Sequence, residues 1–173
     1  MRKLIPLACS IVAVAAFAVA SAGAALDPPG SLSVDEGRGV VMLELRGSVL
    51  GRLASGAIRV TDLTPRDPFG EIVTGRNLVA EERIGPRTVL YRGQGLRFRM
   101  LGGRYRIRVV GAGIALSAVG RGVVLLDGEP KGGETTGLYS LTEGVDCSIE
   151  PTSCTPLPDE PERFVLGSPA EGD

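Results

Sequence analysis

The stretch LRFRMLGGRYRIRV, from Leu96 to Val109, alternates apolar residues with arginines on both sides of a pair of glycines. Alternation with a period of two is typical of a half-buried β-strand. Gly102 and Gly103 can adopt the positive φ angles of a two-residue turn, so we expect a hairpin of two antiparallel strands joined there. In that register three apolar pairs share one face: Met100 with Tyr105, Phe98 with Ile107 and Leu96 with Val109.

The other face of the predicted hairpin carries Arg97, Arg99, Arg104, Arg106 and Arg108. Because the planar guanidinium group suits carboxylates and phosphates, these arginines are a candidate binding site for an anionic polysaccharide or for lipid headgroups of a cell surface. The alternative is structural, with the arginine stems lying along the sheet and nearby carboxylates neutralising their charges. The carboxylates that could do so are Glu44, Asp62, Glu71, Glu81 and Glu82.

The same short alternation continues through the rest of the chain, with 25 glycines that disfavour helices. We expect one all-β domain, an antiparallel β-sandwich or barrel-like sheet of about ten to twelve short strands, four of them between Leu32 and Leu63. Two segments, Leu43–Asp62 and Ile107–Asp127, share an order of strand, glycine, apolar pair, glycine, strand and aspartate. Two weakly related β halves are therefore an open alternative.

The N-terminus has the composition of a secretory signal peptide. Arg2 and Lys3 precede an apolar run that has no charge until Asp27. We expect cleavage after Ala24, a mature domain over residues 25–167, a flexible tail over 168–173 and a secreted or extracytoplasmic protein. An uncleaved membrane anchor is the alternative, because residues 4–25 are about long enough to span a bilayer.

Charge and composition exclude several function classes. Without residues 1–24 the chain has 17 basic residues, 19 less Arg2 and Lys3, against 20 acidic ones, so we expect no nucleic-acid partner. The sequence has no histidine, which excludes Ser-His-Asp and Cys-His nucleophiles and histidine-ligated metals. In DCSIEPTSC, Cys147 and Cys154 are an even pair in an exported chain, which predicts a disulfide.

Two motifs partly resemble ligand sites. Gly111 and Gly113 follow a strand pattern, as in a dinucleotide-binding fingerprint, but Leu116 stands at the third glycine position and no crossover helix fits before the next strand. We therefore expect no dinucleotide and a bend or bulge at these glycines. The segment Asp62–Glu71 has three acids without the spacing of a calcium loop, so no metal is expected.

The acidic pairs Asp35-Glu36 and Glu81-Glu82 are adjacent residues, whereas a glycosidase needs two carboxylates that face each other across a cleft. We predict a secreted, non-catalytic β-domain without a cofactor, which binds an anionic cell-envelope polymer through its arginine-lined face. A purely structural or accessory envelope protein without a ligand is one alternative. An extracellular hydrolase with a more distant carboxylate pair is another.

Overall fold

The computed structural model describes residues 28–64, 70–132 and 135–167. These residues form one antiparallel sheet, which confirms the predicted all-β class. Its seven strands are β1 (Gly30–Asp62), β2 (Ile72–Gly85), β3 (Thr88–Met100), β4 (Arg104–Gly128), β5 (Leu138–Ser140), β6 (Thr155–Pro156) and β7 (Glu162–Leu166), with a 3₁₀ turn at Pro151–Ser153. The predicted signal peptide and the tail after 167 lie outside the described residues. No helix within the described ranges is long and apolar enough to cross a membrane.

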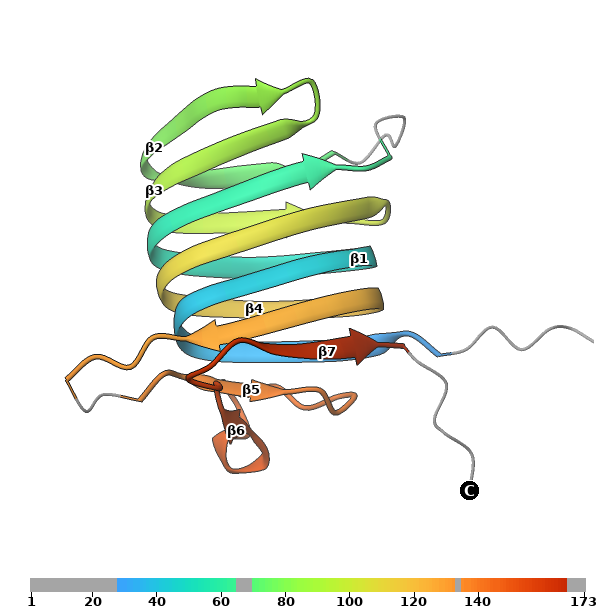
Figure 1. Ribbon diagram of the computed structural model, residues 1–173, viewed down its shortest axis with the longest axis vertical. Coiled ribbons are helices and arrows are strands. Elements are labelled where there is room, and N and C mark those ends of the chain that lie inside the picture. Colours follow the sequence, from blue (N-terminus) through green and yellow to red (C-terminus); the bar gives the residue numbers. More distant parts are fainter. Residues whose placement is uncertain (1–27, 65–69, 133–134, 168–173) are drawn as a thin grey trace, which may run out of the picture.

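β1 and β4 wind together as two antiparallel strands of one coiled sheet (Figure 1). Arg46 of β1 lies opposite Arg104 on one side and opposite Arg121 on the other. Since these two partners are 17 residues apart in β4, about 17 residues complete one turn of the coil. The strand order β2-β3-β1-β4-β7 leaves β2 at one end of the coil and β7 at the other.

The short strands expected from the sequence are sections of longer strands. The four expected between residues 32 and 63 all belong to β1, which is continuous over 33 residues. Its glycines do not end the strand, because the backbone bends at them while its pairing continues. Glycines of neighbouring strand segments also lie side by side in rows across the sheet. One row has five members, each opposite the next: Gly93, Gly56, Gly111, Gly39 and Gly128.

The glycine row permits a close approach of neighbouring strands. A Cβ on Gly111 would overlap the carbonyl oxygen of Ser55, and one on Gly56 would overlap that of Val110. A side chain at either position would thus point along the sheet into the next strand. Because glycine has no side chain, the backbones of neighbouring strands can approach closely here and the sheet can bend from one layer of the coil into the other. The bend predicted at Gly111 is therefore confirmed, with φ values of 149° at Gly111 and 64° at Gly113.

The turn at Gly102-Gly103 does not join a hairpin. In the described chain β3 pairs with β1 and β2, and β4 pairs with β1 and β7, so the predicted hydrogen-bonded register between β3 and β4 is wrong. Both glycines have positive φ, 70° and 67°, and the turn carries the chain from the rear layer in Figure 1 to the front layer. β1 provides a continuous partner on both sides of the turn, since Val49 lies opposite Met100 and Arg46 opposite Arg104.

The alternation nevertheless assigns the two faces of these strands correctly. The six apolar side chains are buried in the core between the layers, none more than 3% exposed: Leu96, Phe98, Met100, Tyr105, Ile107 and Val109. Burial of alternate residues depends on the pleat of each strand and not on which strand pairs with it. The predicted set of buried residues is therefore correct although the predicted strand pairing is wrong.

The C-terminal segment covers one end of the coil. Its β5 pairs with the beginning of β1, and Leu157 is buried in the core. The predicted disulfide between Cys147 and Cys154 is present, and the backbone N–H of Cys147 donates a hydrogen bond to the Ser33 hydroxyl at 3.0 Å. The closing strand expected over 163–166 is β7, which pairs with the last part of β4.

Candidate functional site: an arginine-lined hollow

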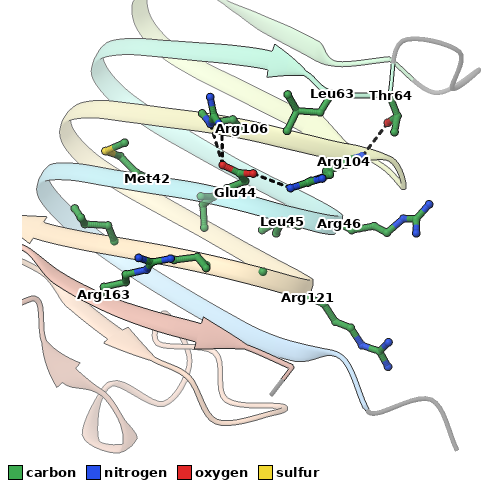
Figure 2. Close-up of a pocket in the computed structure, with 14 residues that line it drawn as sticks. Met42, Glu44, Leu45, Arg46, Leu63, Thr64, Arg104, Arg106, Arg121 and Arg163 are labelled. Atoms are coloured by element: carbon green, nitrogen blue, oxygen red, sulfur yellow. Dashed lines mark hydrogen bonds and ion pairs between the residues drawn. The ribbon is translucent and has the colours of Figure 1, made fainter. Parts of the chain in front are cut away.

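The five arginines predicted as one site lie on two faces of the molecule. Arg97 and Arg99 are near the end of β3 in the rear layer, whereas Arg104, Arg106 and Arg108 are in the first part of β4 in the front layer (Figures 1 and 2). All five side chains are exposed. Because both strands point their apolar residues into the space between the layers, their arginines point outward in opposite directions. The structure thus brings three of the five together and separates the other two from them.

The front layer contains a hollow of about 870 Å³. It lies over β1, the two ends of β4 and β7 (Figure 2). Its charged lining consists of five arginines and one glutamate: Arg46, Arg104, Arg106, Arg121, Arg163 and Glu44. Sequence reasoning missed Arg46, Arg121 and Arg163, because only the coil brings these distant segments beside Arg104.

Arg46 is the centre of a row of three arginines. It lies directly opposite Arg104 on one side and Arg121 on the other, and neighbouring strands of a sheet are about 4.8 Å apart. Figure 2 shows Arg46 and Arg121 at the border of the hollow, both extending toward solvent. Like charges on directly opposed residues destabilise a sheet, and the side chain of Arg104 is turned toward Glu44, away from that of Arg46.

Glu44 neutralises part of this charge. Its Oε1 accepts a hydrogen bond from Nη2 of Arg104 at 2.9 Å, and its Oε2 accepts two from Nε and Nη2 of Arg106 at 3.0 and 2.8 Å. The hydrogen bond from Arg106, supported by that from Arg104, lowers the pKa of Glu44 below its ordinary value despite partial desolvation. The pairing with a nearby carboxylate that the sequence suggests is therefore present at Arg104 and Arg106.

Among the described residues, the other arginines of the hollow have no such partner. Within the described part of the chain, no carboxylate lies at ion-pair distance from Arg46, Arg121 or Arg163. Asp62, another carboxylate considered for this role, instead accepts a hydrogen bond from the backbone N–H of Thr64 at 2.7 Å. The described lining of the hollow therefore has an excess of positive charge.

The floor of the hollow is aliphatic. Met42, Val123 and Leu125 are half-buried on the outer side of the sheet and line it. Met42 lies opposite Arg108 on one side and opposite Leu125 on the other. Leu125 in turn lies opposite Arg163 of β7, so two apolar side chains lie between two arginines in this row.

The rear layer has a second hollow of about 660 Å³ with a more even balance of charge. Arg97 lines it together with Arg52, Arg76, Asp35 and Glu36, and Nη2 of Arg52 lies 3.7 Å from Oδ1 of Asp35. The described lining of the rear hollow has three arginines and two carboxylates, whereas that of the front hollow has five arginines and one carboxylate.

The described residues contain little that suggests catalysis. The carboxylates of Asp35 and Glu36 come from consecutive residues at an irregularity of β1, and Glu44 is held by two arginines. No group of three or more Cys, Asp or Glu side chains within the described ranges could hold a metal ion. The side chains of Glu81 and Glu82 are outside what the structure describes, as are residues 65–69 of the acidic loop.

The glycines of the partial dinucleotide motif lie inside a strand. β4 continues through Gly111 and Gly113 as far as Gly128, whereas the dinucleotide fingerprint requires a strand that passes into a helix. No protein-family model matches the chain, and searches of curated proteins and of solved structures give no match either.

Proposed function

We propose that this chain is a secreted, non-catalytic β-domain that binds an anionic component of a cell envelope at the front hollow. The observation that carries the proposal is the row Arg104, Arg46 and Arg121, in which three arginines lie on adjacent strands of one face. Guanidinium groups bind phosphate, sulfate and carboxylate through paired hydrogen bonds. A multivalent anion would bind Arg46 and Arg121 and compete with Glu44 for Arg104.

One observation favours the second candidate, an accessory envelope protein without a ligand. Arg104 and Arg106 already share the carboxylate of Glu44. In that case the front arginines are a solvated surface with a single internal counterion. The two candidates differ in the affinity of the front face for a soluble polyanion.

Dextran sulfate tests the proposal, because it carries a permanent negative charge and no apolar chain. We expect the double variant Arg46→Ser/Arg121→Ser to bind fluorescent dextran sulfate about tenfold more weakly than the wild type, since two exposed charge-assisted contacts are lost. Counterion release also predicts that the salt dependence of log Kd becomes shallower by about two. Fluorescence anisotropy over a range of salt concentrations measures both effects.

The matched control is Arg97→Ser/Arg99→Ser, which removes the same charge from the rear layer and should bind like the wild type. An equal loss of affinity in both double variants would mean that only net charge matters, which contradicts a front site. Failure of the wild type to bind at low salt would contradict anion binding itself.

A further inference from the structure

The front hollow joins its cationic border to a continuous aliphatic surface. Val123 lies opposite Val165 of β7, whose side chain is 60% exposed, so the apolar floor extends outward to the last strand. Toward the Gly-Gly turn the floor ends at the row that contains Arg46 and Arg121. An elongated ligand lying along the last part of β4 would therefore meet Arg121 at one end and Val123 and Leu125 beyond it. Glu44 and Met42 of β1 would lie on one side of it, and Val165 and Arg163 of β7 on the other.

The chemistry of the floor distinguishes two kinds of anionic ligand. Sugar rings pack best on the flat faces of aromatic side chains, and none of the described residues that line the hollow is aromatic. Among the described aromatic residues, Tyr105 is buried in the core, and the rings of Tyr139 and Phe164 pack on each other with centroids 5.4 Å apart. Flexible aliphatic side chains such as Met42 and Leu125 suit an acyl chain better.

We infer that the ligand of the front hollow is an anionic amphiphile, an inference that rests on the proposed function. The acidic headgroup binds Arg46, Arg121 and the adjacent arginines, and an acyl chain lies on Met42, Val123 and Leu125. The volume of about 870 Å³ is within the range of about 300–1,000 Å³ that is usual for small-molecule sites. Half-buried apolar side chains exposed on the outside of a sheet gain by being covered.

Two soluble phosphates distinguish the contribution of the headgroup to binding from that of the acyl chain. Monomeric dihexanoyl phosphatidate, used below its micelle concentration, has the headgroup and two short acyl chains, whereas glycerol 3-phosphate has the headgroup alone. We expect the wild type to bind the phosphatidate at least about tenfold more tightly, a gain for which burial of about two methylene groups suffices. Isothermal titration calorimetry measures both affinities.

Variants of the floor test which side chains cause the tighter binding of the phosphatidate. Met42→Ser/Leu125→Ser should bind the phosphatidate no more tightly than glycerol 3-phosphate while keeping the affinity for glycerol 3-phosphate. The matched control is Leu50→Ser/Val119→Ser, which changes two side chains of the rear layer that are 48% and 46% exposed and should keep the gain. Val165→Ser, at the outer end of the floor, is a second front variant and should reduce the gain even if the double variant does not fold.

The outcomes separate the two levels of the proposal. Equal affinity of the wild type for both phosphates, with dextran sulfate still bound, would overturn the amphiphile and leave the anion site intact. Tighter binding of polygalacturonate than of the phosphatidate, unaffected by the floor variants, would overturn the amphiphile in favour of an acidic polysaccharide. Loss of the gain in the rear variant would also overturn it. Failure to bind either phosphate or dextran sulfate would overturn the proposed function as well.

Discussion

Glu44 determines how many arginines of the front hollow are available to a ligand. Its two oxygens accept three hydrogen bonds, from Arg104 and Arg106, and it is the single carboxylate among the described lining residues. An incoming anion must compete with Glu44 for these two guanidinium groups. The carboxylate thus stabilises the sheet locally and weakens binding at the same position.

Glu44→Gln is therefore expected to change binding and stability in opposite directions. Affinity for dextran sulfate should rise about two- to fivefold, the usual value of an exposed ion pair. Because the pKa of Glu44 is lowered in the folded state, its contribution to stability is present above its ordinary value near 4.5 and is lost as the pH falls through the folded pKa. The wild type should be the more stable protein at pH 7 and should lose that advantage progressively as the pH falls through the lowered pKa, below 4.5. Anisotropy titrations and urea unfolding over a series of pH values measure these effects.

A comparison over pH provides the control for this prediction. Protonation of Glu44 in the wild type should raise its affinity for dextran sulfate toward that of the variant as the pH falls below 4.5. An affinity gap that stays constant while the Glu44 carboxyl becomes protonated would contradict the role of the carboxylate.

At the level of strands, local alternation and long-range pairing were not equally predictable. Side-chain direction follows from the pleat, so the buried set from Leu96 to Val109 could be named from the sequence alone. The partner of β3 could not, because its place is taken by residues of β1 that are 27 to 51 positions away along the chain. Two adjacent glycines with positive φ suit a hairpin, and they also suit a turn between the layers of a coil. Because the Gly-Gly turn joins two layers and not two paired strands, Arg97 and Arg99 are separated from the other arginines.

One signal in the sequence could have revealed the coil. The glycines at 30, 39, 47 and 56, and again those at 103, 111, 120 and 128, recur at intervals of eight or nine residues. Two such intervals equal the 17-residue turn shown by the pairing of β1 with β4. Turns between short strands, which the sequence predicts, would have such a spacing. Continuous strands that bend at each glycine produce the same spacing.

Gly111 tests the role of the glycine row. Gly111→Ala should destabilise the protein by about 2–4 kcal/mol, because the methyl group would overlap the Ser55 carbonyl oxygen and φ is 149°. The control is Gly85→Ala in β2, where an added Cβ meets nothing within 4 Å, and it should change the free energy of unfolding by less than about 0.5 kcal/mol. Equal urea midpoints for the two variants would mean that this row does not require close backbone approach.

For the whole molecule, the two strands of the coil explain the internal similarity in the sequence. The segments Leu43–Asp62 and Ile107–Asp127 belong to β1 and β4, which pair with each other in antiparallel fashion. An offset of 64 residues relates Gly47 to Gly111 and Gly56 to Gly120. Two strands that wind around a common core need glycines at corresponding bends. A duplication remains a prediction, but the physical requirement for the similarity is evident.

The coil also explains why the site could be found only in part. Its arginines come from the middle of β1, both ends of β4 and β7, and no local motif connects these segments. The sequence identified Arg104 and Arg106 because they share one alternating strand; Arg108 of the same strand is on the front layer but is not among the residues that line the hollow. It missed Arg46, Arg121 and Arg163 because only three-dimensional winding brings them to the same face.

The most direct test of the two-face arrangement is a backbone amide chemical-shift titration of the full chain with monomeric dihexanoyl phosphatidate. We predict shifts that cluster at Met42, Arg46, Arg121 and Leu125, with the amides of Arg97 and Arg99 unchanged. Shifts at Arg97 and Arg99 together with Arg106 and Arg108 would instead indicate one continuous arginine strip on a hairpin, and would contradict the coiled sheet and its front site together.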